Sequence, residues 1–313
     1  MLAEVTRLSL ILTVIAAIFV PVERLFAAHP QKIIRKQFFV DLGYYFLNSL
    51  LVAYLISVPL GILIWSIQKY IPAEFLKTMA SLPIWLKLVL GLVVGETGYY
   101  WGHRMCHEIP FLWDYHSIHH SAESMDFLVN TRAHPIDMMI SRLSALAPQL
   151  LLGLTGSLNQ LESALVPSLV TLFGLVWGYF IHANIRWRFG LMEWVITTPA
   201  FHHWHHTLNG PINVNYAATF PWIDWVFGTI HLPKDLPVAY GVEPALPGAI
   251  IAQLVYPLSA EAPSIRRLTH SQEDLSSVRQ RKDQSTQKCV NQTTSREEVV
   301  NLLNAENEVE AVR

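Results

Sequence analysis

The sequence predicts an all-α integral membrane protein, a helical bundle of about four to five membrane helices with a cytosolic helical cap. Hydrophobic residues make up 52% of the 313 positions, and charged residues only 15%. Apolar runs long enough to cross a bilayer recur along the chain, and histidines gather in short clusters just beyond the ends of these runs. The net charge of −2 gives no sign of a nucleic-acid partner, and none is expected.

Five apolar segments are the expected membrane helices, and the first begins shortly after Arg7. Such a run also fits a signal peptide, with Ala27 and Ala28 near the cleavage site. Because Glu23 and Arg24 lie between the run and those alanines, we expect a retained helix instead. The last two segments form a hairpin that either crosses the bilayer or dips into it. The five segments are residues 9–20, 44–67, 84–101, 138–154 and 161–181.

Basic residues set the expected orientation of the bundle. The loop after the first segment is rich in Lys and Arg, and five crossings place it on the same side as the histidine clusters. Lys and Arg concentrate in cytoplasmic loops, so this side is predicted to be cytoplasmic. The basic residues on this side are Arg24, Lys32, Arg35, Lys36, Arg104, Arg132, Arg142, Arg186 and Arg188.

Three histidine clusters follow helical spacing, one of the form HxxxH and two of the form HxxHH. Side chains three and four residues apart share a helix face, so each cluster is predicted to point its imidazoles in one direction. Neutral imidazole is a common metal ligand, and the eight rings exceed the four that one tetrahedral zinc takes. The clusters therefore predict a site for two metal ions. Their members are His103, His107, His116, His119, His120, His202, His205 and His206.

Two single histidines extend the predicted ligand set. His134 and His182 each lie beside the end of a predicted membrane helix, on the same side as the clusters. His203 is out of register with its neighbours, so we expect it to pack behind the ligands. Burying this many imidazoles without a metal or other partners would cost several kcal/mol, which argues against a purely structural role. Imidazole alone does not choose between zinc, copper, iron and nickel.

One acid lies inside a predicted membrane helix. Glu96 precedes His103 by seven residues and His107 by eleven, so the three side chains share one helix face. Because an acid at membrane depth is costly and often functional, we expect Glu96 to accept a hydrogen bond from a ligating histidine. A structural pairing with a neighbouring helix is the alternative. Cys106 is expected to be a small buried residue, and a disulfide with Cys289 is not expected.

The clusters belong to a longer series of motifs that resembles the fatty acid hydroxylase/sterol desaturase superfamily. The resemblance runs in order from about residue 20 to residue 245. Glu108, directly after His107, is similar to the alkylglycerol monooxygenase branch. Beside the clusters, the motifs are Leu112-Trp113, Arg132-Ala133-His134-Pro135, His182-Ala183-Asn184-Ile185, Thr198-Pro199, Asn215-Tyr216 and Trp222-x-x-Asp224-Trp225-x-Phe227-Gly228-Thr229.

The resemblance implies a membrane-bound di-iron oxidoreductase of lipid metabolism. Such enzymes use O2 and two electrons to hydroxylate or desaturate a sterol, a fatty acid or an ether lipid. Two iron ions are implied as cofactors, bound by the histidines named above, with Glu96, Glu108, Asn184 and His203 behind the ligands. Residues 1–83 are then N-terminal membrane helices and 84–247 the catalytic domain, whose cap at 186–247 rests partly on the membrane interface. Residues 259–313 are polar and are predicted to form a disordered tail.

Electrons are expected to come from a separate protein. Some relatives carry a fused cytochrome b5 domain marked by His-Pro-Gly-Gly, but neither His29-Pro30-Gln31 nor His134-Pro135-Ile136 matches it. The expected partners are a membrane lipid substrate and a reductase, ferredoxin or cytochrome b5-type donor; a tetrahydrobiopterin donor rests on Glu108 alone. Two other functions stay open from the residues themselves, a zinc-dependent membrane lipid hydrolase and a membrane haem protein.

Overall fold

The computed structural model describes residues 2–154, 160–259 and 261–263, and the chain divides into two compact units, Met1–Leu258 and Ser259–Arg313. The predicted disordered tail at 259–313 lies almost entirely outside the described residues. In the first unit, every regular element of the described residues is an α-helix or a short 3-10 helix, apart from two isolated β-bridges. The predicted all-α fold is confirmed.

Three helices in the described part of the chain are long and apolar enough to cross a membrane. They are α1 (Leu2–Leu25), α2 (Phe38–Tyr70) and α7 (Gln160–His182, through its part Leu165–His182). A fourth candidate is the pair of α3 (Ala73–Ala80) and α4 (Ile84–Glu108), which is bent by 112° between the two helices. The number of candidate spans in the described residues is therefore three or four, where about four to five were predicted.

The predicted segment 138–154 corresponds to α6 (Pro135–Leu151), which begins three residues earlier and has only 17 residues. A helix of this length rises about 25 Å, less than the hydrocarbon thickness of about 30 Å. It is therefore not among the candidate spans of the described residues. It still packs along α4 and α2 inside the bundle.

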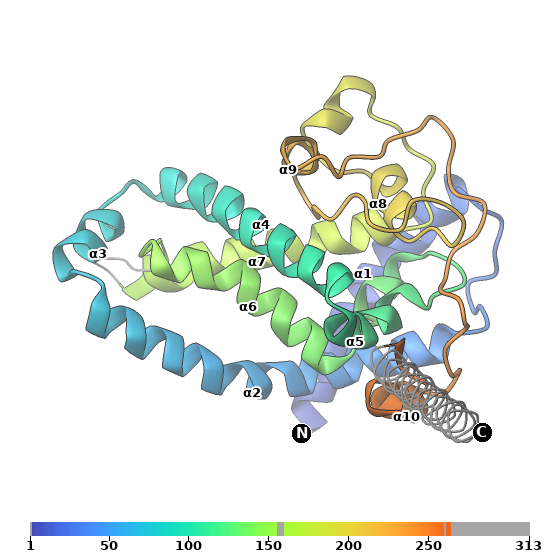
Figure 1. The fold of residues 1–313 in the computed structure, drawn as a ribbon, viewed down its shortest axis with the longest axis horizontal. Coiled ribbons are helices and arrows are strands. Elements are labelled where there is room, and N and C mark those ends of the chain that lie inside the picture. The colour runs from blue at the N-terminus through green and yellow to red at the C-terminus, as the bar shows by residue number, and fades with distance from the viewer. Residues whose placement is uncertain (1, 155–159, 260, 264–313) are drawn as a thin grey trace, which may run out of the picture. The chain divides into compact units, whose positions relative to one another are not determined.

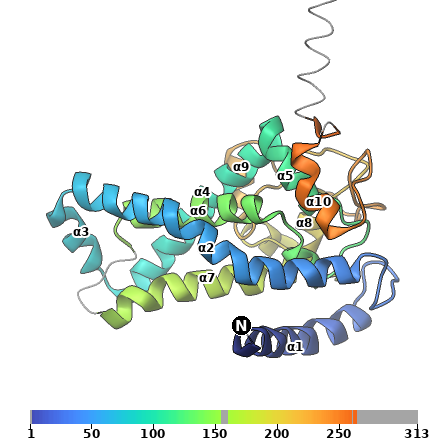
Figure 2. The same cartoon turned by 90° about the horizontal axis from the view of Figure 1, so that it is seen from below.

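The bundle helices α2, α4, α6 and α7 run roughly side by side (Figure 1 and Figure 2). At one end α3 joins α2 to α4, and at the other end lie α5 (Pro110–His120) and α8 (Pro199–His205). Glycines bring α4 close to α6. A Cβ on Gly98 would overlap the carbonyl oxygen of Ser144, and one on Gly102 would overlap its hydroxyl. Small residues at this spacing let helices approach closely, which fixes the histidine-bearing end of α4 against α6.

Short elements form the cap around that end: η1 (Phe127–Thr131), η2 (Gly190–Trp194), α9 (Pro221–Val226), α10 (Ile250–Val255) and η3 (Tyr256–Leu258). Proline opens α5, α6, α8 and α9, at a position where a helix needs no backbone N–H. Side chains also accept backbone N–H groups at helix starts: Asp126 at η1, His134 at α6 and Thr198 at α8. The local sequence thus fixes where each short helix begins.

A buried ion network joins the start of α2 to the cap. The guanidinium of Arg35 donates to both oxygens of Asp126, at 2.6 and 2.7 Å, and also to Asp41. Asp41 accepts from Arg132 as well, and Arg132 donates to the Ser121 hydroxyl at 3.2 Å. All five side chains are buried, so the charges compensate one another in place of water. This network holds the segments that flank α5 and η1.

Candidate metal centre

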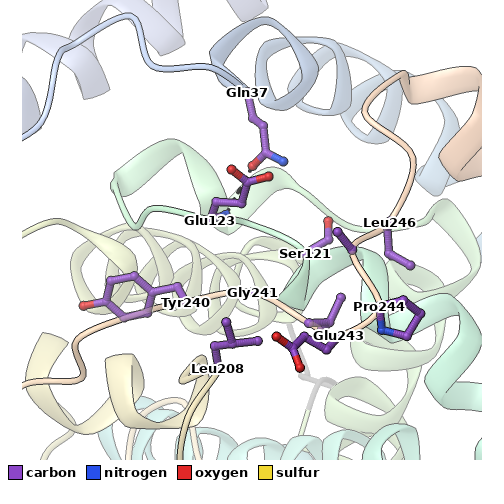
Figure 3. Close-up of a pocket in the computed structure, with 11 residues that line it drawn as sticks. Gln37, Ser121, Glu123, Leu208, Tyr240, Gly241, Glu243, Pro244 and Leu246 are labelled. Carbon is purple, nitrogen blue, oxygen red and sulfur yellow. Dashed lines mark hydrogen bonds between the residues drawn. The ribbon is translucent and has the colours of Figure 1, made fainter.

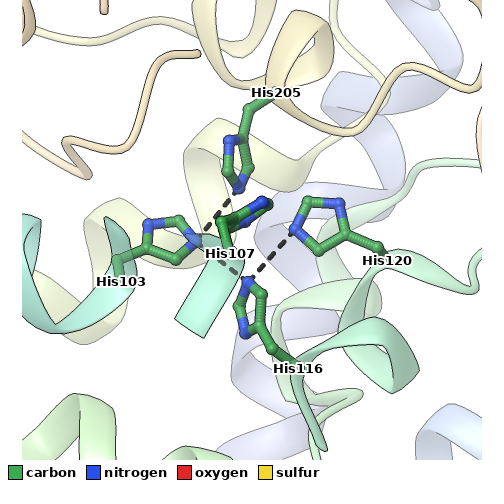
Figure 4. A group of neighbouring side chains, drawn as sticks. All are labelled: His103, His107, His116, His120 and His205. Carbon is green, nitrogen blue, oxygen red and sulfur yellow. Dashed lines mark hydrogen bonds between the residues drawn. The ribbon is translucent and has the colours of Figure 1, made fainter. Parts of the chain in front are cut away.

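Five histidines from three helices converge in one group (Figure 4). Their ligand nitrogens all lie within 4.8 Å of one another. The Nε2 atoms of His103 and His116 are 3.1 Å apart, those of His103 and His205 3.0 Å, and those of His116 and His120 3.2 Å. This first group consists of His103 and His107 from α4, His116 and His120 from α5, and His205 from α8.

Four further histidines form a second group. The Nε2 atom of His182 lies 3.2 Å from that of His119 and 3.0 Å from that of His202, and His202 lies 3.1 Å from His206. The two groups are adjacent, because the rings of His120 and His206 stack at 4.3 Å between centroids. All nine rings are buried.

Each HxxHH cluster divides its histidines between the two groups. In α5, His116 and His120 enter the first group, whereas His119 enters the second. In the other cluster, His202 and His206 enter the second group and His205 the first. The prediction that each cluster points in one direction is therefore wrong for both of them. Histidines four residues apart stay in the same group, but the histidine three residues after the first one is rotated around the helix far enough to reach the neighbouring group.

Backbone carbonyls fix the tautomers of four ligand rings. The Nδ1–H groups of His103 and His205 donate to the carbonyls of Tyr216 and Val214, at 2.7 and 2.8 Å. In the second group, His119 and His182 donate in the same way to Arg132 and Gly178, at 2.8 and 2.7 Å. A carbonyl only accepts, so the proton of each neutral ring is on Nδ1, and Nε2 carries a lone pair.

These tautomers leave lone pairs facing each other in both groups. Nε2 of His103 lies 3.0 Å from Nε2 of His205, and Nε2 of His119 lies 3.2 Å from Nε2 of His182. Two facing lone pairs repel unless a cation lies between them. Two nitrogens that bind the same ion, each at about 2.1 Å and with roughly a right angle at the ion, are about 3.0 Å apart. The residues therefore fit one metal ion in each group.

Burial also keeps the rings in the form that binds metal. It lowers the pKa of His119 to about 4, and the pKa values of His120, His202, His205 and His206 well below the usual range. These rings are therefore neutral at pH 7, and protons compete little with a metal ion for their nitrogens.

Asp137, near the start of α6, contacts a ligand but was not among the residues that the sequence indicated. Its carboxylate accepts from Nδ1 of His116 at 3.0 Å, and both side chains are buried. It also forms a small group with His116 and Cys106, which is buried as expected. A sequence signal existed, because Asp137 is an acid in an apolar helix three residues after His134.

Two predicted histidines lie outside both groups. The ring of His134 accepts from the backbone N–H of Ile136 at 3.1 Å, and its other nitrogen donates to the Leu254 carbonyl at 3.2 Å. Its role in the structure is to cap α6, so we leave it out of the ligand set. His203 donates to the Ala183 carbonyl at 3.0 Å, and its Nδ1 accepts from Tyr240 Oη at 3.0 Å.

Of three other predicted residues, two support the backbone around the groups. Glu96 accepts from the backbone N–H of Thr219 at 2.6 Å, where a hydrogen bond from a ligating histidine was expected. The Asn184 side chain accepts from the N–H of His29 at 2.9 Å and donates to its carbonyl at 2.7 Å. Glu108 is largely exposed and pairs with Arg104 at 2.8 Å.

A cavity of about 610 Å³ opens beside the centre (Figure 3). Ser121, which follows His120, and Leu208, two residues after His206, lie on its wall. Glu123 and Glu243 also line it, but no histidine does, so it is separate from the metal-binding groups.

The fold and the site together define a helical membrane protein with two adjacent groups of buried histidines, each of which could hold a metal ion. A family model described as fatty acid hydroxylase matches residues 88–229. The region that carries both histidine groups therefore contains a fatty acid hydroxylase domain, which confirms the resemblance to the fatty acid hydroxylase/sterol desaturase superfamily seen in the sequence.

Three relatives illustrate the range of this family. Ornithine lipid hydroxylase OlsE of Rhizobium tropici is 33% identical over 56% of this chain and 52% of its own length. Alkylglycerol monooxygenase of Xenopus tropicalis is 30% identical over 50% of this chain and 32% of its own. Methylsterol monooxygenase 2-2 of Arabidopsis thaliana is 25% identical over 57% and 66%. The chain thus spans about half, or less, of the first relatives' lengths, and no solved structure matches it.

Proposed function

We propose that this chain is a membrane-bound lipid hydroxylase or desaturase that uses O2 and two electrons, with two iron ions as its cofactor. The observation that carries the proposal is the pair of facing Nε2 lone pairs in each histidine group, fixed by carbonyls behind the rings. The proposed ligands are the five histidines of the first group and the four of the second. The relatives, which act on lipids according to their names, support the lipid substrate.

The bound irons would supply the oxidant that an unactivated C–H bond requires, which side chains alone cannot provide. The residues of the chain do the rest. Backbone carbonyls and Asp137 hold the ligand rings in one tautomer and one orientation. The rings are buried beneath the cap, so bulk water is excluded from the place where the oxidant would act.

The substrate is proposed to enter from the bilayer, because the histidine groups lie at the ends of the apolar helices α4 and α7. The loop between α1 and α2, at the same end of the bundle, carries Lys32, Arg35 and Lys36. By the bias of basic residues, this end is proposed to face the cytoplasm. A separate reductase, ferredoxin or cytochrome b5-type protein is the proposed electron donor.

The histidine geometry argues against one of the two alternative functions. The facing Nε2 atoms are 3.0 to 3.2 Å apart, which leaves no space for a porphyrin ring between any of these pairs. A zinc-dependent hydrolase would fit the same nitrogens, since zinc also binds imidazole. The identity of the bound metal therefore separates hydroxylase from hydrolase.

The test is elemental analysis and an optical spectrum of the purified protein, followed by a lipid-product screen with and without O2. We expect about two irons per chain, no haem absorption band, and an O2-dependent product from ornithine lipid, alkylglycerol, sterol or fatty acid substrates. His119→Ala and His205→Ala should each lower the metal content. His134→Ala should leave the metal content unchanged. His231→Ala, which removes a partly exposed histidine, is the matched control. Zinc that persists after iron loading, with O2-independent ester or amide cleavage, would establish the hydrolase instead.

A further inference from the structure

Two short segments of the cap expose apolar side chains and bury their charged ones. In η2, Leu191 is 87% exposed, whereas Glu193 is only 4% exposed. In α9, Trp225 is 63% exposed, whereas the neighbouring Asp224 is fully buried. A surface helix that faces water shows the opposite arrangement, with its charges outside. These two segments have the polarity of a surface that faces an apolar medium.

Hydrogen bonds to specific partners hold both acids inside the protein. Glu193 accepts from Arg188 at 2.7 and 2.9 Å, and from the N–H of Phe189. Asp224 accepts from the backbone N–H groups of Tyr216 and Ala217 at 2.8 and 2.9 Å. These two acids are the only charged residues in 189–195 and 221–227, and both turn inward. The outward surface of these segments therefore carries no charge.

This surface continues the apolar faces of two bundle helices. Phe227, just after α9, contacts Trp101 of α4 with ring centroids 4.9 Å apart. Phe189, just before η2, stacks on Phe180 of α7 at 6.1 Å. Figure 1 shows α9 alongside the C-terminal half of α4 rather than beyond its end. The exposed surface of η2 and α9 thus adjoins the C-terminal halves of α4 and α7, in which Trp101 is 43% exposed and Val176 is 51% exposed.

We propose that η2 and α9 are immersed in the membrane, with their apolar side chains among the lipid chains next to α4 and α7. Continuity with those helices favours lipid over a partner protein as the covering medium. The composition agrees, because Trp194, Trp222 and Trp225 are partly or largely exposed, and tryptophan is enriched at the boundary of a bilayer. The inference rests on the proposed membrane placement of α4 and α7.

The immersed surface is joined to the metal centre by two hydrogen bonds in series. Asp224 of α9 holds the backbone N–H of Tyr216, and the carbonyl of Tyr216 accepts from the ligand His103. Immersion of α9 in lipid therefore anchors the loop that contains Tyr216, and this loop orients the ligand His103. Immersion also places the cap at the membrane surface, over the metal centre, so that a lipid reaches the centre without crossing water.

Spin labels on single cysteines test the proposal in the full-length protein reconstituted in lipid vesicles. Cys289→Ser removes the thiol of the tail. Cys106 is kept because it is only 1% exposed, and a labelling reaction on the Cys289→Ser parent verifies that Cys106 takes up no label. Labels are placed at Leu191→Cys and Trp225→Cys. Val89→Cys on α4, at 51% exposure, reports the lipid face, and Val238→Cys, at 92%, is a control in a cap loop. Collision rates are measured with O2, which partitions into lipid, and with chromium oxalate, which stays in water.

We expect the labels at 191 and 225 to show the ratio of O2 to chromium oxalate collisions seen at 89, well above the ratio at 238. If 191 and 225 match 238 while 89 lies in lipid, the inference fails and the proposed function stands. If 89 is also accessible to chromium oxalate, the membrane placement itself fails. Low collision rates with both reagents at 191 and 225 would mean that protein covers the surface, which overturns the proposal as well.

Discussion

Nδ1 of His116 lies 3.0 Å from the carboxylate of Asp137, and both groups are buried. In the other tautomer-fixing contacts of the described centre, the acceptor is a neutral backbone carbonyl. A carboxylate is a stronger acceptor and raises the basicity of the ring that it holds. His116 is therefore expected to be an especially strong ligand of the first group.

Asp137→Ala should weaken metal binding in the first group by roughly 10- to 100-fold, since His116 loses the partner that fixes its tautomer. Asp137→Asn should be milder, because its amide oxygen still accepts from Nδ1. Metal affinity measured by competition with a chelator checks both variants. Glu108→Gln is the control, because Glu108 is exposed and contacts no ligand ring in the described contacts. Equal affinity in Asp137→Ala and the parent would contradict this role.

The spacing of the clusters was enough to indicate eight of the nine histidines that the structure brings together, because side chains four residues apart share a helix face. The ninth, His182, was indicated by its place at the end of an apolar segment. The same reasoning could not divide His119 from His120, since that division depends on how α5 lies against α7 and α8. Asp137 was missed for a related reason: it reaches His116 from a different helix. His134 precedes a proline at a helix start, so its capping role was readable locally.

The membrane helices followed from composition, and three of them are candidate spans in the described residues. The length of α6 was harder to predict, since an apolar run reads the same in a buried helix and in a membrane span. The close approach of α4 and α6 depends on Ser144 facing Gly98 and Gly102, a tertiary contact that spacing within one helix does not reveal.

Gly98→Ala should destabilise the protein by about 1–3 kcal/mol, because the new methyl group would overlap the Ser144 carbonyl and the ring of Pro148. Forcing α4 away from α6 should also lower metal content, since α4 carries His103 and His107. Gly61→Ala is the matched control: it lies in α2 and its Cβ would meet no atom within 4 Å. Thermal unfolding and elemental analysis of both variants check this. Similar behaviour of the two alanine variants would count against close packing at Gly98.

Asp41→Asn should destabilise the protein by about 3–5 kcal/mol, because Arg35 and Arg132 would lose a shared buried anion. The measurement is a denaturant titration of the detergent-solubilised protein. Lys36→Gln removes the exposed ion pair with Glu123 and should change stability by less than about 1 kcal/mol. An equal effect of the two substitutions would show that the buried network is not what stabilises this end of the bundle.

Glu23, near the end of α1, should support the second histidine group, although α1 lies outside the matched family region. Its Oε1 accepts from the N–H of Phe127 at 2.8 Å and from the N–H of Asn184, two residues after His182, at 2.9 Å. Glu23→Ala leaves both buried N–H groups without this acceptor, which costs about 1–3 kcal/mol for each. The backbone after His182 would then shift, and the ring would lose its position in the group.

The expected result for Glu23→Ala is a metal content that falls from two ions per chain toward one, with the ion of the first group retained. Glu23→Gln should keep both ions, because a single amide oxygen can accept both hydrogen bonds where Oε1 now does. Elemental analysis of the two variants separates an effect of geometry from an effect of charge. Loss of metal in both would assign the role to the negative charge of Glu23, and full metal content in the alanine variant would remove α1 from the support of the centre.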